Sequence, residues 1–386
     1  MCNACQCTLT AKILCRLVIS YVYADKGEYR RGNEMMLSAR IHEYQKPLVV
    51  ESVSKPSNIH GEAVLVKVGA AGLCHSDLHL MNGEWKDAIP LTLPKTPGHE
   101  NAGWVEEIGD TVPEGLFSKG DLVAIFGGWG CGICSFCKRG DEQLCISPRW
   151  PGLSQSEGGY SEYIIVPSYR FLVKVPKRGR LNPEELAPLT DAGLTPYRAI
   201  KKVRHMLGPG TSIAVVGMGG LGSYGVQYAR LLAPNSTVIA IDRKDKKLSL
   251  AENFGADRMV NSATTKNIRD EVLELTDGRG VDVVIDTVGA ENTISDSIRI
   301  LAKGGALAVI GLFGGQIKVP LLPAIVNEYQ VIASLWGNYN ELKEVIELAS
   351  QRKIKHAYQS FPLKEINQAI DMLRQGQIIG RAVIVP

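Results

Sequence analysis

Gly217-Met218-Gly219-Gly220-Leu221-Gly222 decides the fold of this chain, because it satisfies G-x-G-x-x-G between an apolar run and an amphipathic run. Residues 212–216 predict a strand and residues 221–232 a helix. The first glycine allows a tight turn, the second lets a pyrophosphate approach the backbone, and the third lets helix and strand pack. The helix N-terminus then attracts the phosphate charge. The residues predicted to bind a dinucleotide here are Gly217, Gly219, Gly220, Leu221 and Gly222.

The residue that should read the ribose is Asp242, which follows the next apolar strand and lies 25 positions after Gly217. Its carboxylate would accept both ribose hydroxyls of NAD and repel the 2′-phosphate of NADP. Arg243 and the lysines after it keep NADP as a second possibility, and we include Arg243 among the cofactor-binding residues. A plain glycine-rich turn with a capping aspartate is the competing interpretation, and the two features together disfavour it.

Outside this turn, the chain shows two kinds of sequence pattern. After Pro183 strands alternate with helices, which is typical of a parallel sheet. From Leu37 to about residue 166 short alternating runs predict a β-rich, barrel-like or sandwich-like part. Two helical stretches (341–350 and 363–373) and a last strand (381–385) should rejoin that first part. A length of 386 residues agrees with about two domains.

Composition excludes several classes of function. The net charge is only +3, and there is no stripe of Lys and Arg with interleaved aromatic residues, so a nucleic-acid partner is not expected. The apolar run 13–24 is interrupted by Arg16 and is too short to cross a bilayer, so no membrane role is expected. A signal peptide would be poorly formed.

The nine cysteines fall into two groups. Cys131, Cys134, Cys137 and Cys145 lie within one short region and predict a closed tetrahedral zinc site, which is structural. Clustered thiols of this kind favour a reducing compartment, hence the cytoplasm. Residues 1–35, with the cysteines at positions 2, 5, 7 and 15, are expected to be a disordered extension or to precede the natural start at Met35 or Met36, and we assign the cysteines in it no function.

A fifth ligand candidate, Cys74, lies in the stretch Gly72-Leu73-Cys74-His75-Ser76-Asp77-Leu78-His79, which mixes a thiolate with proton-carrying groups. His99 and Asp191 are its best partners. One sulfur, one nitrogen and one oxygen ligand would leave a fourth position open, as in a catalytic zinc site.

With these motifs in view, residues 36–386 resemble the zinc-dependent medium-chain alcohol dehydrogenases, most closely their archaeal NAD-linked members. The stretches that carry the resemblance are 72–77, Gly98-His99-Glu100, the four-cysteine lobe, 147–150, Thr195-Pro196-Tyr197-Arg198-Ala199, the glycine turn and Gly380-Arg381. The resemblance implies an α/β protein: a GroES-like catalytic domain (36–190 and 336–386) with a structural zinc lobe (131–145), and a doubly wound Rossmann domain (191–335). It also implies two zinc ions and NAD.

One position departs from the family, which usually has a cysteine where this chain has Asp191. A carboxylate donates less charge than a thiolate, so the metal should be more Lewis-acidic. Glu100 is the alternative oxygen ligand.

The resemblance further implies roles for other residues. Ser76 and His79 would carry the alcohol proton away, and Asp77 would orient His99, while hydride passes to nicotinamide. His75, Thr195 and Arg381 would contact the cofactor. Trp85, Trp150 and Leu335 would line the pocket, and their apolar character favours primary, secondary, cyclic or benzylic alcohols over polyols.

Three other functions compete with this hypothesis. They are a sugar or polyol dehydrogenase of the same family, a zinc-free reductase, and a catalytically silent nucleotide-binding protein. The apolar runs 306–310 and 331–335 resemble those through which family members dimerise, so a homodimer or homotetramer is expected.

Overall fold

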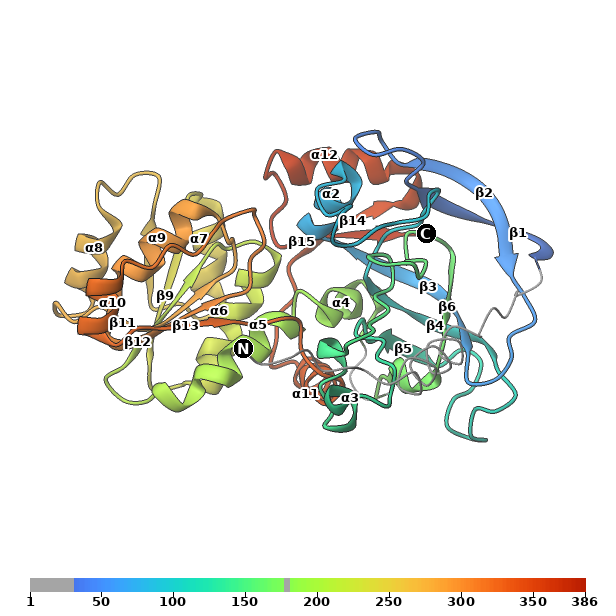
Figure 1. Ribbon diagram of the computed structural model, residues 1–386, viewed down its shortest axis with the longest axis horizontal. Helices are drawn as coiled ribbons and strands as arrows, with labels where there is room; N and C mark the ends of the chain where they lie inside the picture. The colour runs from blue at the N-terminus through green and yellow to red at the C-terminus, as the bar shows by residue number, and fades with distance from the viewer. Residues whose placement is uncertain (1–30, 177–180) are drawn as a thin grey trace, which may run out of the picture.

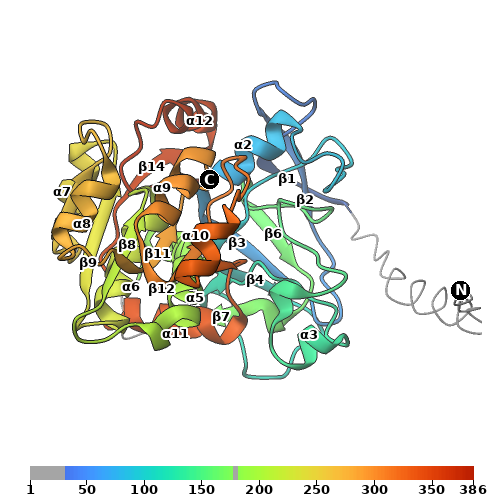
Figure 2. The same cartoon turned by 60° about the vertical axis from the view of Figure 1, so that its left-hand side comes forward.

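The computed structural model describes residues 31–176 and 181–386. Two sheets lie side by side, a parallel one with helices packed against it and a mainly antiparallel one (Figures 1 and 2). One cluster of buried apolar side chains runs from Val64 in the antiparallel sheet through Leu194 to Val215 in the parallel sheet. The two parts therefore share a continuous core.

The parallel sheet has six strands in the order β10-β9-β8-β11-β12-β13. Its elements are β8 (Ser212–Val216), α6 (Gly220–Leu232), β9 (Thr237–Asp242), α7 (Asp245–Asn253), β10 (Arg258–Asn261), α8 (Ile268–Leu275), β11 (Val281–Asp286), α9 (Glu291–Arg299), β12 (Leu301–Val309), α10 (Leu321–Asn327) and β13 (Gln330–Ala333). Renumbered from β8, this order is 3-2-1-4-5-6, the doubly wound arrangement. Its switch point lies between β8 and β11, where ligands of such sheets bind.

The second sheet has the order β14-β15-β3-β4-β5-β7, and β6 pairs with β3. Its strands are β3 (Val64–Leu73), β4 (Glu100–Ile108), β5 (Leu122–Ile125), β6 (Tyr163–Val166), β7 (Leu172–Lys174), β14 (Tyr358–Pro362) and β15 (Arg381–Val385), with β1 (Arg31–Arg40) and β2 (Val49–Pro56) as a separate antiparallel pair. The remaining α-helices are α2 (His75–Asn82), α3 (Ser135–Lys138), α4 (Pro183–Leu186), α5 (Leu194–Val203), α11 (Tyr339–Ser350) and α12 (Ile366–Arg374).

The last strand, β15, brings the end of the chain back to the β-rich part. It pairs antiparallel with β3, with Ala382 opposite Leu73. Its bounds coincide with the strand predicted over 381–385. The pairing places Arg381 next to the stretch that begins at Gly72, so a residue from the far end of the sequence enters the candidate site.

Several elements depart from the sequence-based expectations. β12 begins at Leu301 and not at residue 306, and β4 begins at Glu100 and not at residue 103. The strand β10 was not predicted, because it has only four residues and a mixed pattern, whereas β13 overlaps the apolar strand expected near 331–335 but ends at Ala333. β1 begins at Arg31, ahead of the predicted boundary at residue 36. The rest of the predicted extension, with its four cysteines, lies outside the described residues.

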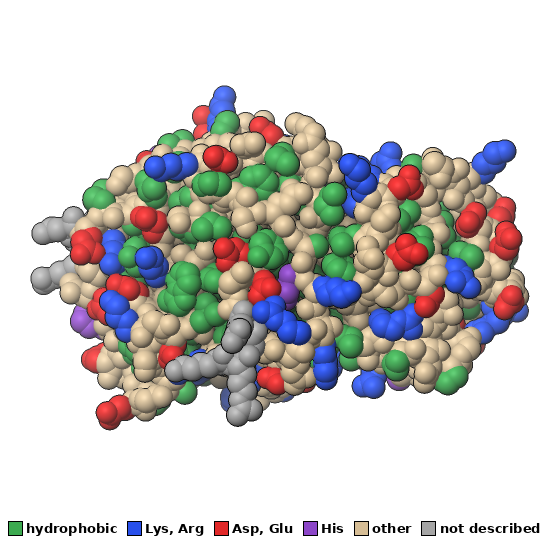
Figure 3. All heavy atoms as spheres, turned by 180° about the vertical axis from the view of Figure 1, so that it is seen from behind, with side chains coloured by type: hydrophobic (Ala, Val, Ile, Leu, Met, Phe, Trp, Pro, Cys, Tyr) green, Lys and Arg blue, Asp and Glu red, His purple; other side chains and the backbone are tan. Residues whose placement is uncertain are grey.

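The surface shows no large region of one charge on the face in Figure 3, where acidic and basic side chains are interspersed. Within 31–176 and 181–386, no helix has both the length and the apolar character needed to cross a membrane.

Candidate active site

The structure brings Cys74, His99 and Asp191 together. Cys74 is the residue before α2, His99 precedes β4, and Asp191 ends a short 3-10 turn shortly before α5. Nε2 of His99 lies 3.3 Å from Oδ2 of Asp191, and Sγ of Cys74 lies 3.9 Å from the same oxygen. Zinc bonds of roughly 2.0–2.3 Å place the donors of a tetrahedron about 3.3–3.8 Å apart. The three donors therefore fit a zinc ion, with a fourth position left for a small molecule.

The charges around these donors favour their metal-binding forms. Burial raises the pKa of the Cys74 thiol, but the positive charges of Arg381 and His99 outweigh it and lower that pKa. Burial acts in the same direction on Asp191, whose pKa is nevertheless held below its usual range by the hydrogen bond and charge of His99 and by Arg381. Thiolate and carboxylate are the forms that ligate a metal.

Asp77 lies behind the donors and is fully buried. Its Oδ1 is 3.3 Å from Nδ1 of His99, and its Oδ2 accepts hydrogen bonds from the hydroxyl of Tyr160 (2.7 Å) and the backbone N–H of Cys74 (2.9 Å). A carboxylate on the second nitrogen of a ligating histidine fixes the ring and its tautomer. The geometry is therefore the one expected for Asp77; Tyr160 was not predicted from the sequence.

Glu100 pairs with Arg381 within the same site. Both side chains are buried, Nε of Arg381 donates to Oε2 of Glu100 at 2.9 Å, and a second short contact joins Nη2 to Oε1. Burial raises the pKa of Glu100, and Arg381 opposes that effect. Because its oxygens are already engaged, Glu100 is less available as a ligand than Asp191, although it belongs to the same group of potential donors. The sequence did not predict this ion pair.

The four cysteines Cys131, Cys134, Cys137 and Cys145 form the second group of potential metal donors in the described part of the chain. Sγ of Cys134 lies 3.5 Å from that of Cys137 and 3.9 Å from that of Cys145. Zinc–sulfur bonds near 2.3 Å require a separation of about 3.8 Å. Four sulfur donors fill a tetrahedron, so this site fits a structural zinc ion and leaves no position for a substrate.

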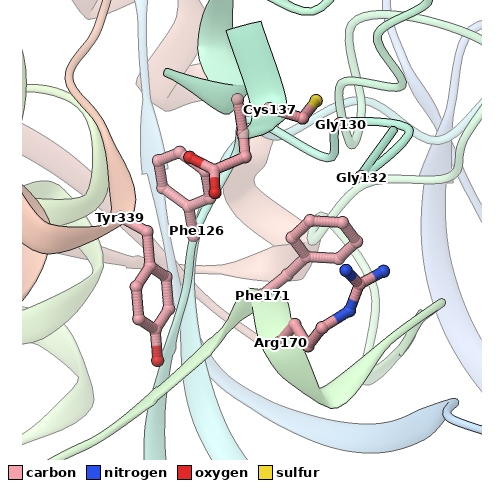
Figure 4. A pocket seen from close by; sticks show the side chains of 8 residues that line it. Phe126, Gly130, Gly132, Cys137, Arg170, Phe171 and Tyr339 are labelled. Carbon is pink, nitrogen blue, oxygen red and sulfur yellow. The ribbon is translucent and has the colours of Figure 1, made fainter. Parts of the chain in front are cut away.

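A small cavity of about 110 Å³ lies beside this lobe and is lined by Cys137, Phe126, Phe171, Arg170 and Tyr339, among others (Figure 4). It is separate from the larger cleft that holds Cys74. Its walls come from the lobe, from the residues just after β5 and just before β7, and from the start of α11, so it marks where the lobe packs on the body of the protein.

The glycine turn between β8 and α6 adopts the predicted geometry. Gly217 has a φ of +87°, which favours glycine. A Cβ atom on Gly222 would lie 1.7 Å from the carbonyl oxygen of Gly217, so the third glycine is required for close packing. Asp242, at the end of β9, accepts a hydrogen bond from the backbone N–H of Met218 at 2.6 Å. Turn and carboxylate therefore face one place at the switch point of the sheet.

Residues 60–177 match the family model described as the alcohol dehydrogenase GroES-like domain, and residues 220–351 match that of zinc-binding dehydrogenases. The chain belongs to the zinc-dependent alcohol dehydrogenase family. The predicted fold class, zinc and NAD agree with this membership and with the relatives.

Among its relatives is the "NAD-dependent alcohol dehydrogenase" of Sulfurisphaera tokodaii, which is 39% identical over 358 residues, covering 91% of this chain and 100% of that protein. The crystal structure of the alcohol dehydrogenase from Aeropyrum pernix superposes with a TM-score of 0.85 at 41% identity, covering 91% of this chain and 100% of that one. A "D-arabinose 1-dehydrogenase (NADP(+))" of Saccharolobus solfataricus is 34% identical over 352 residues, covering 90% of this chain and 97% of that protein.

In this alcohol dehydrogenase, one continuous cleft of about 1950 Å³ joins the donor set to the glycine turn. All predicted contact residues of cofactor and substrate except Gly222 line it. They are Ser76, His79, His75, Thr195, Gly217, Gly219, Gly220, Leu221, Asp242, Arg243, Arg381, Trp85, Trp150 and Leu335. Gly222 is absent from the lining because it faces the turn.

His79 and its neighbours form a group that the sequence predicted only in part. Nδ1 of His79 lies 2.5 Å from Oε2 of Glu84, and the imidazole stacks on Trp85 with 5.1 Å between the ring centroids. Nε2 is buried and has no hydrogen-bond partner among the described residues. Glu84 therefore engages one ring nitrogen and leaves the other without a partner among the described residues. The short separation of positions 79 and 84 in the sequence was the available signal for Glu84.

Two of the predicted cofactor residues also act on other parts of the site. Oγ1 of Thr195 donates to Oδ1 of Asp191 at 2.7 Å, so Thr195 braces the carboxylate that faces the metal position. His75 packs edge-on against Phe313, with ring centroids 5.9 Å apart. Burial lowers the pKa of His75 to about 4, helped by the charge of Arg381, so its ring is neutral at pH 7.

The walls near the donors include a residue that the sequence did not predict. Leu335 lines the cleft but is 41% exposed, whereas Trp336 next to it is 5% exposed and packs edge-to-face on Trp150, with ring centroids 6.3 Å apart. Ile89, Leu144 and Leu153 complete the apolar side of the cleft. The resemblance to the family predicted position 335 as the wall residue. Trp336 was missed because the orientation of its side chain depends on packing against distant residues, which the local sequence pattern does not show.

Proposed function

We propose that this protein is a zinc- and NAD-dependent dehydrogenase that reversibly oxidises primary and secondary alcohols, including cyclic and benzylic ones, to aldehydes and ketones. The observation that carries the proposal is the donor set Cys74, His99 and Asp191, which opens into the same cleft as the glycine turn and Asp242. A single cleft lets an alcohol at the metal position meet a nicotinamide ring.

Zinc supplies a Lewis acid for the alcohol oxygen, and NAD supplies the hydride acceptor. The chain's own residues do the rest. Cys74, His99 and Asp191 hold the metal position, with Asp77 and Thr195 fixing two of them in orientation. Ser76 accepts the alcohol proton at Oγ while its own hydroxyl proton passes on toward Nε2 of His79; the imidazole then loses a proton from Nδ1 through Glu84, which is exposed to solvent.

At the cofactor end, the carboxylate of Asp242 accepts hydrogen bonds from the ribose hydroxyls, and the backbone of the turn 217–222 approaches the pyrophosphate. His75, Arg243 and Arg381 line the surrounding wall. A carboxylate at the ribose favours NAD over NADP, because the 2′-phosphate would be repelled.

The substrate side favours a hydrophobic alcohol over a sugar. Trp85, Trp150 and Leu335 are apolar or aromatic, and the neighbouring wall residues Ile89 and Leu153 are apolar as well. A polyol needs polar partners for each hydroxyl that it buries. Sugar oxidation, the activity named for one relative, is therefore the second candidate.

The experiment combines a zinc count per chain with NAD-linked turnover on an alcohol panel. Two zinc ions, together with faster turnover of benzyl alcohol or cyclohexanol than of arabinose, support the proposal. A better rate on arabinose would favour the sugar candidate. Binding of NADH with no turnover of any alcohol, and a Cys74→Ala variant indistinguishable from the parent, would favour a catalytically silent protein.

We assign residues 36–190 and 336–386 to the catalytic domain and 191–335 to the NAD-binding domain. Reduced thiols at positions 131–145 suit a reducing compartment, so we place the protein in the cytoplasm.

We also propose a homodimer or homotetramer that buries the exposed edge of the parallel sheet. β13 is the edge strand, and the adjoining α10 exposes Leu321, Leu322, Ile325 and Val326. An uncovered edge with apolar neighbours is typical of an interface. Light scattering on an Ile325→Glu variant tests this: a shift to monomer supports the interface, and an unchanged mass contradicts it.

A further inference from the structure

Trp336 has a backbone conformation that large side chains rarely adopt. Its φ is +43°, in the left-handed region, although the residue is not glycine. Such a conformation costs free energy and persists only where the surroundings hold it. Since the side chain is 5% exposed, packing of the indole is what holds it.

The indole occupies space that Gly127 leaves free. Gly127 lies just after β5 of the antiparallel sheet, and Trp336 lies between β13 of the parallel sheet and α11, so the contact joins segments that follow different sheets. A Cβ atom on Gly127 would lie 2.5 Å from Cζ2 and 2.8 Å from Cη2 of Trp336. Any side chain at position 127 would therefore push the indole out of its place.

The same indole faces the metal-binding residues. Its ring packs edge-to-face on His99, with centroids 6.0 Å apart and an angle of 69° between the planes, and on Trp150 at 6.3 Å and 73°. All three residues line the cleft. Trp336 and Trp150 thus form an aromatic corner in the wall of the cleft, beside the metal-binding residue His99.

We propose that Trp336, seated on Gly127, limits the size of the second substituent on the carbinol carbon. The inference rests on the proposed function and narrows its substrate class to primary alcohols, benzylic ones included, and secondary alcohols with a small second group. Planar rings fit the aromatic corner by edge-to-face contact. A longer second substituent collides with the indole.

The test compares kcat/KM with NAD for benzyl alcohol and for 1-phenylpropan-1-ol, which adds an ethyl group at the carbinol carbon. One methylene group in a tight pocket changes kcat/KM by about 10- to 200-fold. We expect Trp336→Leu to raise the ratio of kcat/KM for 1-phenylpropan-1-ol to kcat/KM for benzyl alcohol by at least ~10-fold. Trp104→Leu is the matched control, because Trp104 is on β4, is 38% exposed and does not line the cleft.

A Gly127→Ala variant tests the same contact by adding a methyl group at position 127. Its methyl group must displace the indole from its place in the cleft wall, so we expect kcat/KM for benzyl alcohol to fall. Adding Trp336→Leu to Gly127→Ala should restore that activity, because the clash is then gone. Such a rescue measures the coupling of the two positions directly.

An unchanged substrate ratio in Trp336→Leu, with NADH binding and two zinc ions retained, would overturn the inference while leaving the proposed function intact. If Trp336→Leu does not fold, a Gly127→Ala variant that loses no activity on benzyl alcohol overturns it as well. Failure of the parent enzyme to oxidise any alcohol would instead count against the proposed function.

Discussion

Oδ1 of Asp77 lies 3.3 Å from Nδ1 of His99, with both side chains buried, while Nε2 on the other side of the same imidazole points to Asp191. One ring therefore connects a buried carboxylate to the metal position. This arrangement makes the affinity of the site for zinc depend on a residue that does not touch the metal.

Asp77→Asn should weaken binding of the catalytic zinc by about 10- to 100-fold, because an amide holds the imidazole less firmly and lowers its basicity. Competition with a chromophoric chelator measures this affinity. The four-cysteine site serves as an internal control and should keep its zinc. Tyr160→Phe, which removes only the hydroxyl that donates to Asp77, should have a smaller effect. Equal zinc affinity in the Asp77→Asn variant and the parent would contradict the role assigned to Asp77.

Asp191→Asn should reduce the zinc content from two ions to one per chain and lower kcat by ~1000-fold or more, since the metal loses an anionic ligand. Asp191→Cys should keep both ions, because a thiolate at this position also donates to zinc. Metal analysis and turnover on benzyl alcohol are the measurements. Two zinc ions in the asparagine variant would point to Glu100 as the oxygen ligand.

Asp242→Ala should raise KM for NAD by roughly tenfold and improve the use of NADP relative to NAD, because the repulsion of the 2′-phosphate disappears. Arg243 next to it supplies positive charge for that phosphate. The loss of the bond to the Met218 N–H also loosens the turn, so thermal unfolding without cofactor should be recorded alongside. If the variant used NADP and NAD in the same proportion as the parent, a group other than Asp242 would be the one that contacts the ribose.

The buried Lys95 should make the free energy of unfolding depend measurably on pH. Burial lowers the pKa of this lysine from 10.5 to about 8, which the carboxylate of Glu157 offsets only in part. Between these two pH values the unfolded chain binds more protons than the folded one, so the free energy of unfolding contributed by Lys95 rises with pH, by up to ~3 kcal/mol. Lys95→Met should therefore be more stable than the parent at pH 7, and this advantage should shrink toward pH 10. Urea unfolding of both proteins at several pH values gives the difference; a constant difference would contradict it.

Local patterns predicted those parts of the site that lie within a few residues of one another. The turn 217–222, the four-cysteine lobe and the strand 381–385 each carry their own spacing, and the structure has them where they were expected. Asp191 lies far from Cys74 in sequence, and it was predicted because a catalytic zinc needs a further ligand besides Cys74 and His99; the resemblance then pointed to the same position.

The residues that were missed depend on contacts between distant segments. Tyr160 meets Asp77 across 83 positions, and Arg381 meets Glu100 across 281. The indole of Trp336 fits its site only because Gly127 has no side chain there. No single-sequence pattern encodes such pairs, because they arise only when the two sheets pack together.

The position of Asp191 in the chain gives the metal site a mechanical property. Cys74 and His99 adjoin strands of the antiparallel sheet, whereas Asp191 leads into α5, whose Tyr197 packs against Tyr228 of α6 with ring centroids 5.0 Å apart. A rotation of one sheet against the other would therefore stretch or compress the ligand field itself. Loading the nucleotide should then shift the visible absorption bands of a cobalt-substituted enzyme, so that the metal reports on a binding event at the far end of the cleft.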